Sequence, residues 1–297
     1  MKSLTRLFVV FCACNALALI AFAGPEALPS GKEMKEIAPM PPPPGCHWTG
    51  FYLGLNGGYS WTNDNRVDTD SEDIFGNPLL GNGVIYGVAA ADLATFSLRN
   101  SNDGFIGGGQ FGYNLEFWRL VAGVEADIQG VFGSDATTTA DSSVKVAGGP
   151  TEFLIQSARV SREMQFFGTV RGRLGFAVTP CLLVYGTGGL AYGEVVSRTS
   201  ITQMITNAPG VPNAYSASGR YENPSVGWTL GGGLEWMFWG RWSVKAEYLY
   251  YDLGSVHYRT KPLNNFNFQG TLFTTTQPTS TTSFDGNIVR AGLNFHF

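Results

Sequence analysis

Residues 226–254 read VGWTLGGGLEWMFWGRWSVKAEYLYYDLG, and two kinds of residue alternate along most of this stretch. Because side chains of a β-strand point alternately to opposite faces, the pattern predicts two strands, each with one aromatic-rich face and one small or charged face. The break at residues 239–241 predicts a tight hairpin turn. Each arm is about as long as a tilted strand needs to be to cross a bilayer. The apolar face comprises Val226, Trp228, Leu230, Gly232, Leu234, Trp236, Phe238, Trp242, Val244, Ala246, Tyr248 and Tyr250.

The same alternation recurs elsewhere, so eight strands are predicted in all. They cover residues 48–61, 105–117, 120–129, 164–178, 182–192, 226–238, 242–254 and 284–297. The connections alternate between long polar inserts and short turns, and residues 74–98, within the first insert, are ambiguous. In an antiparallel up-and-down sheet this order places all long loops at one end and all tight turns at the other. That sorting is typical of outer-membrane barrels, which have short periplasmic turns and longer external loops.

Several segments resemble the bacterial outer-membrane β-barrel family of small porin-like surface proteins. These are WTGFYLGLNGGYSW (48–61), GFIGGGQFGYN (104–114), YGTGGLAYG (185–193), GWTLGGGLEW (227–236), WSVKAEYLYYDLG (242–254) and VRAGLNFHF (289–297). The resemblance implies an all-β fold, an eight-stranded antiparallel up-and-down transmembrane β-barrel, in the outer membrane. It also implies that Phe297 is the terminal aromatic residue that the outer-membrane assembly machinery reads. Members differ in function, so the motifs indicate fold and location more strongly than activity.

The N-terminal 47 residues divide into two segments. Lys2 and Arg6 precede an apolar run that ends at a small-x-small site, Ala21-Phe22-Ala23, which predicts a cleaved secretory signal peptide over residues 1–23. Residues 24–47 end in a proline run and predict a semi-rigid periplasmic tether. The barrel domain is therefore expected to span residues 48–297.

Composition excludes several classes of function. The chain of 297 residues carries a net charge of −4 and no basic stripe, which argues against a nucleic-acid partner. Its three histidines are not spaced for a metal site, and nothing indicates a cofactor. His257 near Asp252 is the one pair that could serve a hydrolase, and we expect no enzyme. The glycine triplets lie within predicted strands, so they do not indicate a phosphate loop.

Three functions remain open on the sequence alone. The leading expectation is a structural, surface-exposed outer-membrane barrel with at most weak diffusion activity, whose partner is the lipid bilayer and whose loop ligand is unknown. The second is a diffusion porin for small solutes. The third is a secreted lipocalin-like barrel with its apolar face inward, which would crowd the aromatic residues into a small cavity.

Charged residues on the polar faces predict a salt-bridge network inside the lumen, because eight strands leave an interior that side chains fill. The expected network is Glu125, Asp127, Arg171, Arg173, Glu235, Lys245, Glu247 and Arg290. Pairing Phe238 with Trp242 across a three-residue turn places Glu235 directly opposite Lys245. Interfacial aromatic girdles are expected from Trp48, Trp61, Trp118, Trp236, Trp239 and Trp242.

Two cysteines remain after the expected cleavage, Cys46 before the first strand and Cys181 at the start of the fifth. These strands lie on opposite sides of an eight-stranded ring, too far apart for a direct bridge. Only the tether could carry Cys46 across. Free thiols or intermolecular pairing are therefore favoured over an intramolecular disulfide.

Overall fold

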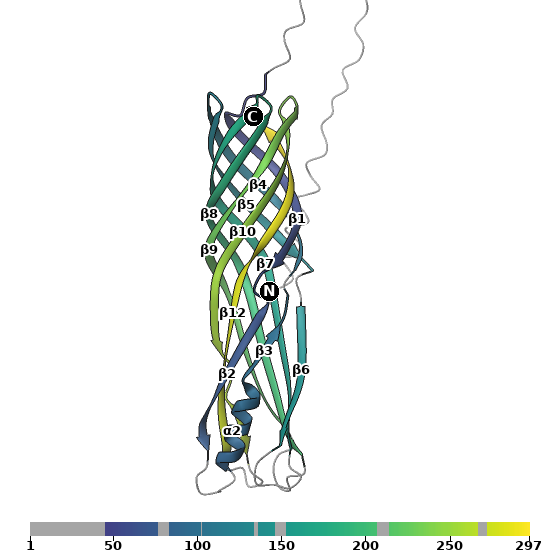
Figure 1. Ribbon diagram of the computed structural model, residues 1–297, viewed down its shortest axis with the longest axis vertical. Coiled ribbons are helices and arrows are strands. Elements are labelled where there is room, and N and C mark those ends of the chain that lie inside the picture. Colours follow the sequence, from purple (N-terminus) through teal and green to yellow (C-terminus); the bar gives the residue numbers. More distant parts are fainter. Residues whose placement is uncertain are drawn as a thin grey trace, which may run out of the picture. The chain divides into compact units, whose positions relative to one another are not determined.

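The computed structural model describes residues 45–76, 83–101, 103–133, 136–145, 153–206, 214–266 and 272–297 (Figure 1). The expected signal peptide and the expected tether up to residue 44 lie outside the described residues.

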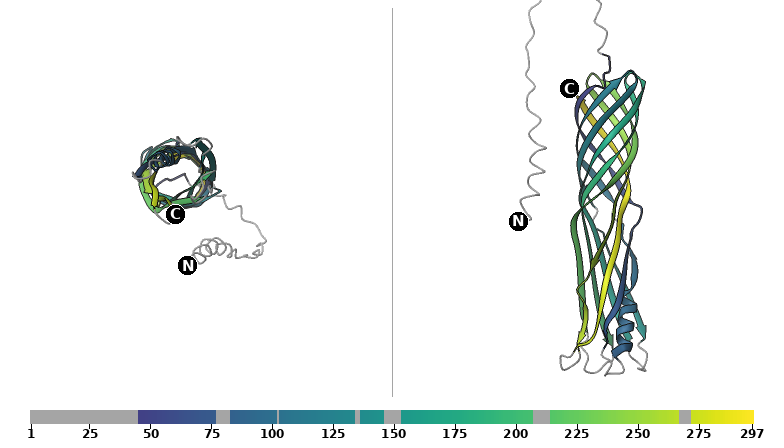
Figure 2. Two further views of the ribbon diagram at one scale, coloured as in Figure 1. Left: turned by 90° about the horizontal axis from the view of Figure 1, so that it is seen from below. Right: turned by 90° about the vertical axis from the view of Figure 1, so that its left-hand side faces the viewer.

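Eight antiparallel strands close into a ring, as predicted (Figure 2, left). In ring order they are β1 (Gly50–Thr62), β4 (Gly104–Phe117), β5 (Leu120–Phe132), β7 (Phe153–Thr179), β8 (Leu182–Thr206), β9 (Tyr215–Trp239), β10 (Trp242–Arg259) and β12 (Leu272–His296). The ring closes where β12 pairs with β1, for example Leu293 with Leu55. The three tight turns and the C-terminus share one end (Figure 1).

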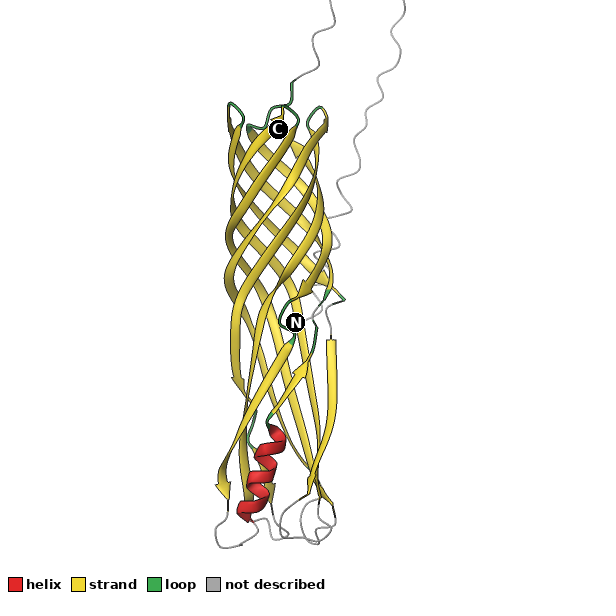
Figure 3. Cartoon of the chain, in the orientation of Figure 1, coloured by secondary structure: helices red, strands yellow, loops and turns green. Residues whose placement is uncertain are grey.

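The long inserts differ from the expectation of solvated loops. Strands β7, β8, β9 and β12 run for 25 to 27 residues, more than twice the ~10 residues that a bilayer-crossing strand needs. They continue past the barrel as a sheet extension, hereafter the extension, which also contains β2 (Arg66–Gly76), β3 (Phe96–Arg99), β6 (Ala136–Lys145) and β11 (Leu263–Phe266) (Figure 3). Threonine is frequent in the last insert, TTTQPTSTTS at residues 274–283, and β-branched threonine favours strands.

One helix, α2 (Gly83–Ala94), lies within the segment that the sequence left ambiguous. It packs against β2, β12, β6 and β7, and Ala90 and Ala94 are buried. Inward-facing Gln203 donates to the Ala90 carbonyl oxygen at 2.8 Å, which places the helix inside the extension. Among the described residues, no helix is long and apolar enough to cross a membrane.

The outer face of the barrel is apolar, and its inner face is polar. Leu230, Leu234 and Trp236 of β9 are 60%, 51% and 54% exposed, whereas Glu235 between them is fully buried. From Trp228 to Phe238 this face covers eleven residues, or about 25 Å along the barrel axis at ~3.3 Å per residue and ~40° tilt. That height matches the hydrocarbon layer that a transmembrane barrel must cross.

The β9–β10 hairpin corrects one detail of the predicted register. Trp242 pairs with Trp239, and a register shift then aligns Ser243 with Met237, so Phe238 is the extra residue of a bulge. The turn itself is Gly240-Arg241, and Gly240 has the positive φ of 54° that such a tight turn requires. The bulge restores the predicted alignment of Lys245 with Glu235.

Candidate functional site

The charged residues expected in the lumen lie together inside the barrel. All eight are buried, each no more than 4% exposed, and they comprise four carboxylates and four cations. They come from β5, β7, β9, β10 and β12, so the network spans the lumen from wall to wall. The members are Glu125, Asp127, Arg171, Arg173, Glu235, Lys245, Glu247 and Arg290.

Glu125 lies at the centre of this network. Its carboxylate accepts hydrogen bonds from the Lys245 ammonium at 2.8 and 2.9 Å and pairs with the Arg171 guanidinium. Arg173 lies 3.5 Å from the same carboxylate. Three strands, β5, β7 and β10, are thereby joined through one side chain.

Arg290 and Glu247 form a second centre. They are direct ladder partners, and the Arg290 Nε donates to Glu247 Oε2 at 2.7 Å. Arg290 also pairs with Asp127 at 2.8 Å, and Arg171 pairs with Glu247 at 3.0 Å. Each guanidinium therefore pairs with two or three carboxylates that come from two strands, which satisfies charges that are costly to bury alone.

The register places Glu235 beside Lys245, but no ion pair joins them. Glu235 instead accepts from Arg173 at 2.6 Å, from Asn294 at 2.7 Å and from the Ser243 hydroxyl at 2.6 Å. The expected pair between ladder neighbours is thus replaced by pairs across the lumen. The ladder fixes which residues are adjacent, whereas barrel closure brings Arg173 nearer to the carboxylate.

Aromatic side chains that the sequence did not single out complete the network. The Tyr52 hydroxyl donates to Glu125 at 2.7 Å and accepts from Arg173 at 2.8 Å. The Arg173 guanidinium also lies 3.9 Å from the centroid of the Tyr185 ring. Tyr52 occupies a polar-face position of its strand, and that was the available signal for it.

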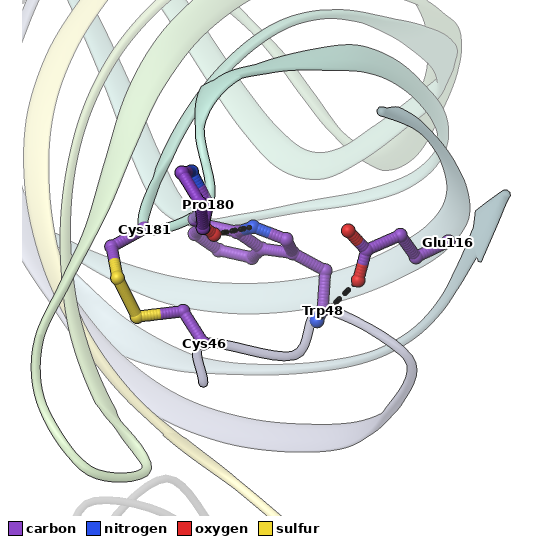
Figure 4. Close-up of a disulfide and its surroundings, with 5 residues drawn as sticks. All are labelled: Cys46, Trp48, Glu116, Pro180 and Cys181. Atoms are coloured by element: carbon purple, nitrogen blue, oxygen red, sulfur yellow. Dashed lines mark hydrogen bonds between the residues drawn. A yellow bond between two sulfur atoms is a disulfide. The ribbon is translucent and has the colours of Figure 1, made fainter. Parts of the chain in front are cut away.

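A short N-terminal segment closes the turn end of the lumen (Figure 4). Cys46 and Cys181 form a disulfide, with 5.2 Å between their Cα atoms. The expectation of free or intermolecular thiols is therefore wrong. The residues before β1 carry Cys46 across the lumen to the turn between β7 and β8.

Trp48 follows the disulfide into the barrel and is fully buried. Its indole Nε1 donates to the Pro180 carbonyl oxygen at 3.0 Å, and its amide donates to Glu116 at 3.0 Å (Figure 4). The indole meets the His296 ring edge-on at 5.8 Å. Trp48 is thus a lumen residue, and its assignment to the membrane girdle is wrong. We refer to residues 46–48 as the N-terminal plug.

The other girdle residues lie on the outer surface or at its rim. Trp118, Trp236, Trp239 and Trp242 are 88%, 54%, 75% and 38% exposed, and Trp61 is half-buried near the opposite end of β1. Trp118 adopts a positive φ of 61°, a strained conformation for a bulky residue, at the tip of the β4–β5 turn. Phe297 is 64% exposed, its amide donates to the Phe51 carbonyl oxygen at 2.9 Å, and its ring packs on Phe295.

Further layers fill the interior from the network toward the extension. The first is apolar and includes Ile106, Met164, Phe167, Ala191, Val195, Leu249, Tyr251, Leu253, Val256, Phe284 and Ile288. Above it lies Arg162, buried, which donates to the carbonyl oxygens of Asp64, Asn100 and Ser283. A hydroxyl layer follows, in which Tyr258 lies 2.7 Å from Thr199 and 2.9 Å from Ser197.

His257 and Asp252 do not form a catalytic pair. The His257 ring bonds the Thr281 hydroxyl at 2.9 Å, and the Asp252 carboxylate accepts from the Gly254 amide at 2.7 Å. In the described part of the chain, no three His, Cys, Asp or Glu side chains are grouped for a metal ion.

Known proteins share this architecture. A family model described as outer membrane protein beta-barrel domain matches residues 37–297. A 31 kDa outer-membrane immunogenic protein of Brucella melitensis is 34% identical over 213 residues, which cover 70% of this chain and 72% of the relative. A 22 kDa outer membrane protein of Rhizobium leguminosarum is 28% identical over 219 residues, 73% of this chain and 70% of the relative. The solved structure of OprG from Pseudomonas aeruginosa aligns with 84% of this chain and 98% of its own at 12% identity and a TM-score of 0.38.

The fold, the family match and the Brucella relative decide between the membrane barrel and the secreted lipocalin-like barrel. An apolar outer band around a charged, buried interior is the reverse of a lipocalin, which places its apolar face inward. The family model matches residues 37–297, which include all eight strands of the ring. The chain belongs to the outer membrane protein β-barrel domain family and is an integral protein of the outer membrane.

Proposed function

We propose that this protein is a closed structural barrel that anchors the extension at the cell surface, and that it is not a diffusion porin. The buried eight-charge network carries this proposal, because its pairs span the lumen from wall to wall. The N-terminal plug lies on the periplasmic side of the network, and the apolar layer lies on the other. A diffusing solute would have to displace all three layers.

Single-channel recording in planar lipid bilayers tests this proposal. We expect no conductance steps from the wild type, and none after reduction of the Cys46–Cys181 disulfide, because the network still fills the lumen. Steps that appear only in a Lys245→Met/Arg290→Met double variant would support the network as the barrier. Arg220→Gln, a change on the outer face of the extension, is the matched control. Large steps from the wild type would instead establish an open porin.

We propose that the protein is not an enzyme. A serine, a histidine and a glutamate do meet in the lumen, where Ser243 Oγ lies 2.9 Å from His296 Nε2 and 2.6 Å from Glu235 Oε1. Ser243 is fully buried, His296 is 5% exposed, and Trp48 packs against the imidazole, so no substrate can reach the hydroxyl. A serine-directed fluorophosphonate should therefore leave Ser243 unlabelled, and labelling that Ser243→Ala abolishes would contradict this proposal.

We propose that Phe297 is read by the outer-membrane assembly machinery. Its ring is exposed beside Phe295 at the end of β12, the strand that closes the ring. In cells, Phe297→Ser should lower the yield of membrane-inserted protein, whereas Phe238→Ser, a lipid-facing change inside a strand, should lower it less. Equal yields from the two variants would contradict a specific role for the terminal residue.

A further inference from the structure

Three arginines form a row on the outer face of the extension. Arg198 of β8 is the direct ladder partner of Arg220 of β9. The Lys261 amide donates to the Ser218 carbonyl oxygen at 3.0 Å, so these two segments run side by side and antiparallel. Two residues before Lys261 and two residues after Ser218, Arg259 therefore lies beside Arg220. All three side chains are exposed, and the residues flanking Arg259, Tyr258 and Thr260, are buried. We call Arg198, Arg220 and Arg259 the arginine row.

The charge of this row is poorly balanced by the protein itself. Like charges directly opposite each other destabilise a sheet. Arg220 forms an ion pair with Glu222. Among the described residues, no carboxylate lies in salt-bridge range of Arg198 or Arg259. Lys261 and Arg159, also exposed, add positive charge nearby, and Glu163, as close to Arg198 on β7 as Arg159 is, adds one carboxylate. The row is thus a positive surface that the fold keeps at a cost in stability.

A second pair of opposed arginines lies in more acidic surroundings. Arg66 of β2 and Arg99 of β3 are also direct ladder partners. They share a surface hollow with Asp64, Asp68 and Asp285, so three carboxylates lie around the two cations, although no ion pair among the described residues joins them within salt-bridge range. This contrast makes Arg66 and Arg99 a matched control for the arginine row.

The row lies well beyond the lipid head groups. Tyr192 of β8 and its ladder partner Val226 of β9 mark the outer edge of the apolar band, and Arg198 and Arg220 each follow six residues further along their strands. At ~3.3 Å per residue this is about 20 Å of strand, or about 15 Å along the barrel axis at ~40° tilt. A head-group region is only about 5 to 8 Å thick on each side of the hydrocarbon layer. The molecules beside the wall at that height are the saccharides of outer-leaflet glycolipids.

We propose that the arginine row binds phosphate- or carboxylate-bearing saccharides of the glycolipids that surround the barrel in the outer leaflet. The planar guanidinium donates two parallel hydrogen bonds to a phosphate or carboxylate, which suits arginine to this role better than lysine. Glycolipids that share the leaflet with the barrel are held at high effective concentration beside the row. The bound anion would also relieve the repulsion between Arg198 and Arg220.

Equilibrium binding to the full protein in neutral detergent micelles tests this proposal. The probe is fluorescent lipopolysaccharide with a phosphorylated inner core, compared with lipid A that lacks the core saccharide. In Arg198→Gln/Arg220→Gln/Arg259→Gln the affinity for the core-bearing probe should fall by about tenfold or more at low salt. The Arg66→Gln/Arg99→Gln control should bind like the wild type. The wild-type affinity should also weaken as salt is raised.

Two further variants separate binding from folding. Glu222→Gln frees the Arg220 guanidinium and should tighten binding. Arg198→Gln removes the repulsion with Arg220, so it should raise the unfolding temperature of the ligand-free protein while it weakens binding. Equal affinities of the triple variant and the control would overturn the proposal. So would lipid A binding as tightly as the core-bearing probe, or binding of soluble dextran sulfate in preference to the glycolipid.

Discussion

Lys245 and Glu235 face each other across the β9–β10 ladder, yet the Lys245 ammonium bonds Glu125 on β5 at 2.8 Å. Glu235 bonds Arg173 on β7 at 2.6 Å. Glu125 lies on the opposite side of the ring from Lys245, and Arg173 lies two strands from Glu235, so the network ties non-adjacent strands together and does not reinforce a single ladder. The stability of the barrel therefore depends on pairs that adjacency in the sheet does not reveal.

The first prediction concerns the pair Glu125 and Lys245. Lys245→Met leaves the buried carboxylate of Glu125 without its ammonium partner, and Glu125→Gln leaves the ammonium without its main acceptor. Each single change should lower the free energy of unfolding by about 3–5 kcal/mol, the typical cost of removing one partner of a buried pair. The double variant should recover part of that loss. Urea titrations of the detergent-folded barrel measure all three values.

The ladder pair provides the control for this cycle. Glu235 and Lys245 lie next to each other in the sheet but share no ion pair, so Glu235→Gln and Lys245→Met form the control cycle. Their coupling energy should be clearly smaller than that of Glu125 with Lys245. If the ladder pair couples more strongly than the cross-lumen pair, the observed network does not control stability.

The second prediction concerns the disulfide. Cys46 and Cys181 are separated by 135 residues, and a cross-link that closes so long a loop restricts the unfolded chain by up to about 5 kcal/mol. Cys46→Ser and Cys181→Ser should each lower the unfolding temperature, and the double variant should match the singles. Reductant should lower the unfolding temperature of the wild type but not of either variant. Additive losses from the two cysteines would contradict the bridge.

Strand parity accounts for what the sequence could predict. A period of two fixes which side chains face inward, so Glu235, Glu247 and Arg290 could be placed in the lumen without a structure. Their partners across the lumen depend on how far the strands are staggered when the ring closes, and no local pattern reports that stagger. Trp48 was misplaced for a related reason, because an aromatic residue just before a strand fits a girdle as well as a plug.

The strands of the extension could not be predicted from the sequence for a different physical reason. Apolar alternation is strongest where one face meets lipid. Beyond the bilayer the outer face meets water, and the inner face mixes hydroxyl groups with apolar side chains such as Leu154, Ile201 and Ile205. The segment TTTQPTSTTS within β12 therefore has no amphipathic period, although its threonines favour a strand. Its ladder with β10 continues through Val256 paired with Thr282.

The third prediction concerns the glycine triplet of β4. A Cβ atom on Gly108 would overlap the backbone carbonyl of Ile128 on the neighbouring strand, which cannot move aside. Cβ atoms on Gly107 and Gly109 would lie 3.7 and 3.8 Å from their nearest atoms, an ordinary contact. Gly108→Ala should therefore reduce the yield of folded barrel, and Gly107→Ala and Gly109→Ala should not. Band shifts on unheated gels compare the three, and equal yields would show that the strands separate more easily than the structure indicates.

The fourth prediction concerns Arg162, which joins the barrel to the extension. Its buried guanidinium donates to the carbonyl oxygens of Asp64 before β2, Asn100 after β3 and Ser283 of β12. It also lies 4.7 Å from the Phe284 ring centroid, and no acidic side chain of the described residues pairs with it within salt-bridge range. Burial lowers the pKa of this guanidinium, so its three carbonyl bonds are what keep a charged group in place.

Arg162→Met should therefore release β2 and β3 from the wall, while the charge network below the apolar layer keeps the barrel folded. Limited proteolysis should cut near Asp64 and Asn100 at least several times faster in the variant, with an unchanged unfolding temperature of the protected barrel core. Arg159→Met, an exposed position three residues away on the same strand, is the matched control and should be cut at the wild-type rate. Cleavage that is equally fast in both variants would mean that the β2–β3 pair is held by the ladder of β2 with β12 alone. A barrel core that unfolds together with the hairpin would mean that barrel and extension form one cooperative unit, because the loss of a single buried cation would then propagate through the apolar layer.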